Sequence, residues 1–158
     1  MHIRLQAANQ VLKEGFGINP NDSYQAFQHF KKVAEFWGNE DNTPCFHYVT
    51  SFTGETAPTA EKAMELTNEI FKDVTDSHLA ATGTHFKDRE WNWYHNHTVV
   101  SPTNINDGSL MYGDNTTNFA LAQKMADVTV QPTKLIIRKE DGTEVEIPKV
   151  FVPHDYGD

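Results

Sequence analysis

Three histidines, His85, His95 and His97, lie close together in a chain that has eight histidines in all. His95 and His97 are two residues apart in a run that we expect to be a strand, so their side chains point to the same face. If this strand pairs antiparallel with residues 78–86, His85 lies directly opposite His95 and one diagonal step from His97. Opposite residues are ~4.5–5.5 Å apart at Cβ, and diagonal ones ~7–8 Å. The spacing therefore predicts three imidazoles around one metal ion.

Three neutral nitrogen ligands leave coordination positions open for a substrate, which is typical of a catalytic metal site. The single cysteine, Cys45, excludes an internal disulfide and a multi-cysteine zinc site. His47 lies on a predicted strand and faces either this site or an ordinary position of the sheet. The alternative for the three histidines is a solvated face of the sheet that holds no metal.

The elements that position these histidines can be read from hydrophobic periodicity and from capping residues. Thr59 is suited to cap a helix, whereas Gly38 is suited to end one. The predicted helices are 3–14, the stretch between Asn19-Pro20 and Gly38, 60–74 and 116–127. The predicted strands are 45–52, 78–86, 95–101 and a short one over 110–112, with a charged and aromatic connection over 87–94.

The C-terminal tail carries a hairpin signal, in which Asp141-Gly142 separates residues 135–139 from residues 143–147. Strands that follow one another without regular helical crossovers indicate an α+β fold, with an antiparallel sheet and helices packed on it. The length of 158 residues fits one domain, and we expect residues 1–158 to form it, with 129–158 as the hairpin tail.

The composition narrows the classes of function. No stretch approaches the ~20 apolar residues that a membrane span needs, and Met1 to Gln10 lacks a signal peptide's apolar run. We therefore expect a cytoplasmic protein. Thirteen Lys and Arg against 22 Asp and Glu give a net charge of −9, which taken alone argues against a nucleic-acid-binding protein.

Several short motifs point the other way. They are Phe46–Phe52 with Gly54-Glu55, Thr84-His85-x-x-Asp88, His95-Asn-His97 with its apolar run, Asn104, and Asp107-Gly108. Together they resemble the relaxase/mobilisation nuclease family, the DNA-nicking enzymes of mobile plasmids and integrative conjugative elements. The similarity runs from about Gly17 to about Val128, which is most of the chain.

The resemblance implies an antiparallel sheet of about five strands whose central histidine triad holds a divalent ion (Mg, Mn or Zn) against the scissile phosphate. A tyrosine attacks single-stranded DNA at a transfer origin, leaving a 5′-phosphotyrosyl link and a free 3′-hydroxyl. His85, His95 and His97 match the triad, and His47 matches a further family histidine. Asp88 matches an acid that orients an imidazole, although a solvated loop acid is the alternative. Accessory mobilisation proteins are implied as partners.

The nucleophile is the first departure from the family pattern. The family tyrosine lies upstream of the block that Gly15–Pro20 matches, and we expect that motif to be missing here. Tyr24 precedes Tyr48 and follows the block, within a predicted helix. It is therefore a candidate nucleophile, with helix packing as the alternative.

The expected DNA contacts are the second departure. The spacing between His85 and His95 is about two residues longer than usual, and Trp91 and Trp93 fall within it. These tryptophans either stack on unpaired bases, at ~1–3 kcal/mol per base, or cover the site. We expect DNA contacts from Lys87, Arg89 and Asn104 as well. Because the basic residues are scattered and the net charge is negative, we expect weak DNA affinity.

Three hypotheses follow from these observations. The first is a metal-dependent relaxase core that nicks single-stranded DNA, and the second is an inactive DNA-binding remnant of a relaxase. The third is an unrelated three-histidine metallohydrolase with Glu55, Glu65 or Glu90 as its general base. A tyrosine near the metal favours the first, and a buried carboxylate beside it favours the third.

Overall fold

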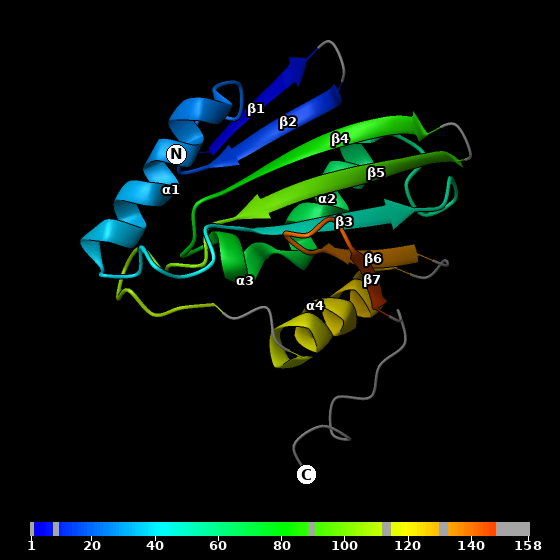
Figure 1. The fold of residues 1–158 in the computed structure, drawn as a ribbon. Helices are drawn as coiled ribbons and strands as arrows, with labels where there is room; N and C mark the ends of the chain where they lie inside the picture. The colour runs from blue at the N-terminus through cyan, green and yellow to red at the C-terminus, as the bar shows by residue number, and fades with distance from the viewer. Residues whose placement is uncertain (1, 8–9, 89–90, 112–114, 130–132, 148–158) are drawn as a thin grey trace.

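In the computed structural model, the described residues are 2–7, 10–88, 91–111, 115–129 and 133–147 (Figure 1). For some of them, including 86–88 and 91–93, the backbone alone is described. The strands are β1 (His2–Ala7), β2 (Gln10–Phe16), β3 (Phe46–Phe52), β4 (Ala80–Asp88), β5 (Trp91–Val100), β6 (Thr133–Arg138) and β7 (Glu144–Ile147). The helices are α1 (Ser23–Phe36), α2 (Ala60–Ile70), α3 (Lys72–Thr75) and α4 (Asn115–Val128).

The described strands form one antiparallel sheet in the order β1-β2-β4-β5-β3-β6-β7. The predicted α+β class is therefore confirmed, with seven strands in place of about five. A hairpin forms each edge of the sheet. The hairpin β1–β2 pairs with β4, and the predicted tail hairpin β6–β7 pairs with β3 and completes the sheet.

The helix predicted over residues 3–14 is wrong, because this segment forms the β1–β2 hairpin. Its apolar pattern was weak, and pairing with β4 determines its conformation. Leu12 and Glu14 are both buried under α2, whereas Lys13 between them is half-buried and faces the other side. That alternation has the period of a strand.

The predicted Thr59 cap of α2 and the predicted end of α1 before Gly38 are confirmed, but α1 begins at Ser23, three residues after the predicted start at Asn19-Pro20. Asp22 is the N-cap of α1, and its carboxylate accepts a hydrogen bond from the Gln25 N–H at 2.9 Å. The Thr59 hydroxyl accepts one from the Lys62 N–H at 3.1 Å, where α2 begins. The helix predicted over 60–74 is interrupted at Phe71, which separates α2 from α3.

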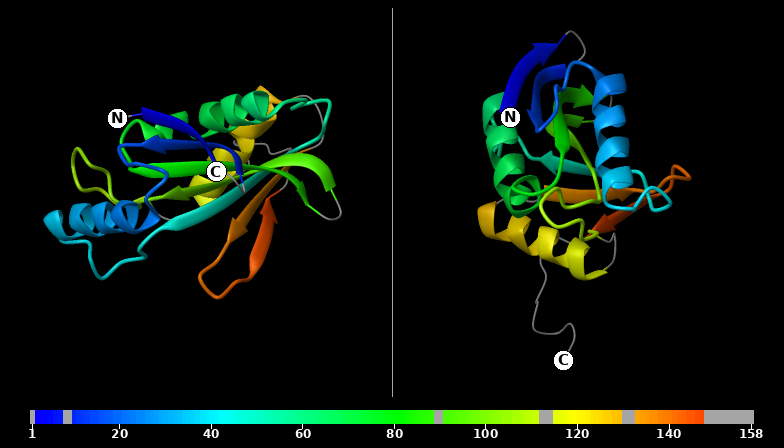
Figure 2. Two further views of the ribbon diagram at one scale, coloured as in Figure 1. Left: turned by 90° about the horizontal axis from the view of Figure 1, so that it is seen from above. Right: turned by 90° about the vertical axis from the view of Figure 1, so that its left-hand side faces the viewer.

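The two faces of the sheet are covered differently (Figure 2). Helices α2 and α4 cover one face, where residues such as Tyr48, Phe52 and Met125 form the main core. Helix α1 lies on the other face and buries Phe30 beside Ala81 of β4 and Val99 of β5. These contacts lie where β4 begins and β5 ends, so α1 covers one end of its face and leaves the middle of the strands to other side chains.

Candidate metal centre

The strands β4 and β5 bring the three histidines together. In their antiparallel register His85 is directly opposite His95, as predicted, and His97 is opposite Gly83. The strands extend to Asp88 and from Trp91, so most of the predicted connection over 87–94 is strand rather than loop. All three histidines have the parity of Ala81 and Val99 and therefore lie on the α1 face of the sheet.

The geometry of the cluster fits one metal ion. One ligand nitrogen from each of His85, His95 and His97 lies within 4.8 Å of the others. The ring centroids are 5.3 Å apart for His85 and His95, 4.8 Å for His85 and His97, and 5.5 Å for His95 and His97. A tetrahedral ion with bonds of ~2.0–2.1 Å needs nitrogens ~3.3 Å apart, which small rotations of half-buried rings can provide.

The electrostatic environment keeps His97 and His85 uncharged near neutral pH. Burial, followed by the charges of His85, His47, His95 and Arg138, lowers the pKa of His97 to about 3. Burial also lowers the pKa of His85, and His95 and Lys13 add to this effect. Neutral imidazole is the form that offers a lone pair to a metal.

His47 joins the cluster from β3. Its Nε2 lies 2.9 Å from Nδ1 of His97, so one of these nitrogens donates a hydrogen bond to the other. Burial lowers the pKa of His47, and Arg138 lowers it further. With Nδ1 engaged by His47, the Nε2 of His97 is left for an ion, which is how an outer partner usually fixes a ligating imidazole.

Asn96 is a supporting residue that sequence reasoning missed. It lies between His95 and His97 and, by strand alternation, points to the opposite face under α2. Its fully buried amide donates hydrogen bonds to the Ala63 carbonyl at 3.0 Å and to the Thr67 hydroxyl at 2.7 Å. These bonds attach the centre of β5 to α2. The sequence contained a signal for this role. Asn96 lies between two candidate ligands on a predicted strand, so its polar side chain must face the side of the sheet opposite the ligands.

The other expected site residues either make no described contact with the cluster or have no described side chain. Tyr24 is on α1 and is 75% exposed. Asn104 lies in the loop beyond the end of β5, where its side-chain oxygen accepts from the Asn106 N–H at 2.8 Å. Arg89 lies outside the described residues, and the backbone alone is described for Lys87, Asp88, Trp91 and Trp93. The DNA-contacting and orienting roles of these residues stay predictions.

The other tyrosines with described side chains lie on the opposite face. Tyr48 is buried in the main core, and Tyr94 packs beside Leu12 and the α2 residues Ala60 and Met64. Tyr112 and Tyr156 lie outside the described residues.

The carboxylates named for a metallohydrolase receive no support from the described residues. Glu55 is exposed, and Glu65 is exposed on α2, where it pairs with Lys62 at 3.7 Å. Glu90 lies outside the described residues. The fully buried Glu14 accepts a hydrogen bond from Asn68 at 2.6 Å under α2, away from the histidine face.

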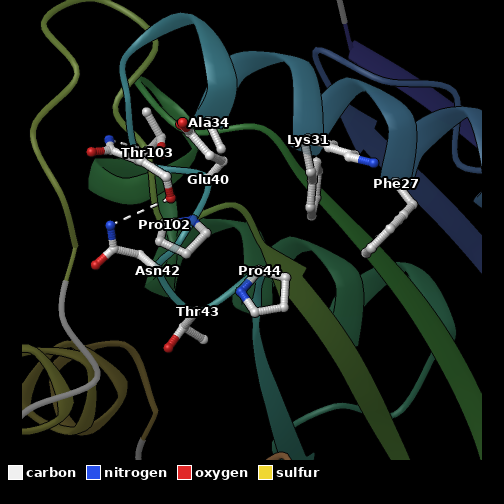
Figure 3. A pocket seen from close by; sticks show the side chains of 11 residues that line it. Phe27, Lys31, Ala34, Glu40, Asn42, Thr43, Pro44, Pro102 and Thr103 are labelled. Atoms are coloured by element: carbon white, nitrogen blue, oxygen red, sulfur yellow. Dashed lines mark hydrogen bonds between the residues drawn. The ribbon is translucent and has the colours of Figure 1, made fainter.

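A pocket of about 240 Å³ lies between α1 and the loops at the end of the sheet (Figure 3). Phe27 and Lys31 of α1 line it together with Pro44, Pro102 and Thr103. None of the residues lining this pocket is a histidine, so it is separate from the metal cluster.

The family model described as "Relaxase: MobA/VirD2-like, nuclease domain" matches residues 5–131 of this chain. Neither a curated protein nor a solved structure matches the chain significantly. In the described part of the chain, no helix combines the length and the apolar character that crossing a bilayer requires.

Proposed function

Because the chain belongs to the MobA/VirD2-like relaxase nuclease family, we propose that it is a relaxase core that nicks one strand of DNA at a transfer origin in a metal-dependent reaction. One observation supports the metal dependence above all others. The ligand nitrogens of His85, His95 and His97 lie within 4.8 Å of one another on the α1 face of the sheet.

In this proposal the three imidazoles hold a divalent ion, and His47 fixes the ring of His97. The ion, when bound, supplies Lewis acidity at an oxygen of the scissile phosphate. Imidazole nitrogen suits Zn²⁺, whereas Mg²⁺ prefers oxygen ligands and gives up its water reluctantly. We therefore propose that the site binds Zn²⁺ most tightly, Mn²⁺ less tightly and Mg²⁺ most weakly.

The proposed covalent step exchanges one phosphodiester for another. A tyrosine oxygen bonds to phosphorus while the bond from phosphorus to O3′ breaks, and the proton lost by tyrosine is balanced by one gained at O3′. The reverse reaction rejoins the strand, because one phosphoester is formed for each one broken. Tyr24 is the proposed nucleophile among the tyrosines whose side chains are described. Accessory mobilisation proteins are proposed partners at the origin.

One observation favours a second candidate function. Tyr24 is 75% exposed on α1, while Tyr48 and Tyr94 pack on the face opposite the histidines. If neither Tyr24 nor another tyrosine reaches the metal cluster, the domain binds DNA and metal without forming a covalent link.

The test is a denaturing gel of the protein incubated with Mn²⁺ and labelled single-stranded DNA from the transfer origin. We expect a labelled adduct with the wild-type protein and none with His97→Ala. The matched control is His29→Ala, which removes a histidine of α1 that is not part of the cluster. An adduct that persists in His97→Ala would contradict the proposed metal dependence.

Tyr24→Phe tests the nucleophile separately, because it removes the hydroxyl and keeps the aromatic ring. Loss of the adduct with unchanged metal uptake supports Tyr24 as the nucleophile. An adduct that persists in Tyr24→Phe shows that another tyrosine attacks. If the wild-type protein binds the DNA but forms no adduct, the second candidate function is favoured.

A further inference from the structure

Two basic side chains flank the histidine cluster on its own face of the sheet. On one side, Lys13 of β2 is the register partner of Gly83, which is in turn the partner of His97. On the other side, Arg138 of β6 is the register partner of His47, whose ring bonds to that of His97. Residues that are directly opposite in a sheet share a face, so Lys13, the histidines and Arg138 all lie on this face. The register places them on a diagonal, because the row through Lys13 and His97 continues to Ile136 on β6, and Arg138 lies two residues further along that strand. This diagonal is the row from Lys13 to Arg138.

Both cations lie close enough to the cluster to interact with it electrostatically. Lys13 interacts with His85, and Arg138 interacts with His47 and His97. On the edge strand β7, Glu144 is the partner of Arg138 and Glu146 is the partner of Ile136. The middle of the face therefore places the imidazoles between two basic side chains, in a chain whose net charge is −9.

The guanidinium of Arg138 is fixed by an ion pair with Glu144, but this pair occupies only some of its N–H donors. Its Nε and Nη2 donate to the same oxygen of Glu144, at 3.0 and 2.8 Å. A guanidinium has five N–H donors, so three do not take part in this pair. The side chain is 40% exposed, and a fixed guanidinium with outward donors suits the oxygens of a phosphate.

We propose that the row from Lys13 to Arg138 binds the phosphate backbone of a single DNA strand that crosses the sheet over the histidine cluster. Lys13 contacts a phosphate on the β2 side of the cluster, and Arg138 contacts another on the β6 side. The strands β2 and β6 are four steps apart, which is ~19 Å at ~4.8 Å per step. This inference rests on the proposed function, but Arg138 lies beyond residue 131, where the family match ends.

The experiment measures binding of a fluorescein-labelled oligothymidylate, about 20 nucleotides long, by anisotropy over a range of salt concentrations. EDTA is present, so that the metal does not contribute. Each phosphate contact to a single strand contributes about −0.7 to the slope of log K against log salt. We expect Lys13→Ala and Arg138→Ala each to make that slope shallower by about 0.7, and the double variant to make it shallower by about 1.4.

Matched controls separate a local contact from a general change of charge. Lys139→Ala removes the same charge from the residue next to Arg138, at the turn of the hairpin. Lys62→Ala removes it from α2, on the opposite face. Neither is expected to change the slope. Arg138→Lys keeps the charge and should keep most of the slope. Comparison with this variant shows whether the change in Arg138→Ala comes from the lost charge and not from a folding defect.

The outcomes distinguish this inference from the proposed function. If the wild-type protein binds the oligonucleotide and Arg138→Ala and Lys13→Ala bind with an unchanged slope, the row is not the binding surface. The same conclusion holds if Lys139→Ala and Lys62→Ala reduce the slope equally. If the wild-type protein does not bind the oligothymidylate, this inference fails, whereas the proposed function is decided by the adduct with DNA from the transfer origin.

Discussion

At the scale of single residues, His97 is the centre of the cluster. Its ring contacts His47 through one nitrogen and lies 4.8 Å, between centroids, from the ring of His85. Because burial and the neighbouring imidazoles lower the pKa of His97 to about 3, the ring is neutral at neutral pH without a metal. A ligand that carries no proton at neutral pH does not have to release one when an ion binds.

The same lowered pKa predicts how the metal-free protein responds to acid. Unfolded His97 has a pKa near 6.5, so the unfolded chain binds more protons between pH 6.5 and about 3. The contribution of His97 to the free energy of unfolding is thus intact above pH 6.5 and is lost as the pH falls toward 3. Urea denaturation in EDTA at a series of pH values should show a shallower pH dependence in His97→Asn than in the wild type. Identical pH dependences would contradict the lowered pKa.

At the scale of elements, the central strand β5 serves both faces of the sheet. Its odd-numbered residues His95 and His97 provide proposed ligands, whereas Asn96 between them bonds to α2 through Ala63 and Thr67. Thr67 also shares a hydrogen bond with Thr50 of β3, at 2.9 Å. The buried polar network therefore holds the strand in the register that aligns its ligands.

Asn96→Ala should destabilise the fold and weaken metal binding together. Removing the amide leaves the buried Thr67 hydroxyl and Ala63 carbonyl with fewer partners, at a cost of about 1–3 kcal/mol in the free energy of unfolding. Chemical denaturation measures this loss, and calorimetry measures the metal affinity. Asn106→Ala, at an exposed loop position, is the control and should change neither. Unchanged stability and affinity in Asn96→Ala would show that this network does not position the ligands.

At the scale of the whole molecule, one face of the sheet is packed against the main core and the other face carries the histidine cluster. Helices α2 and α4 bury the main core on one side, while α1 covers only an end of the other (Figure 2). The proposed metal ligands thus lie on strands in the middle of the fold. An ion bound there holds β4 and β5 together in the native state and has no equivalent site in the unfolded chain.

Metal binding should therefore raise the melting temperature. At a free metal concentration about 100 times Kd, binding stabilises the native state by about 2.7 kcal/mol. For a chain of this size that corresponds to a rise of roughly 5–10 °C in Tm. Thermal unfolding with and without Zn²⁺ measures this shift, which should be absent in His85→Ala. An equal shift in His85→Ala would place the stabilising metal elsewhere.

The order of residues alone was enough to predict the histidine cluster, the α+β class and the family. Strand alternation, the pairing of adjacent antiparallel strands and helix caps depend on residues that are close together in the chain, so the positions of His85, His95, His97 and Thr59 could be interpreted locally. The β1–β2 hairpin, the contact of His47 with His97 and the row from Lys13 to Arg138 depended on pairing between distant strands. Such pairing is determined by packing across the whole sheet, and local patterns do not specify it.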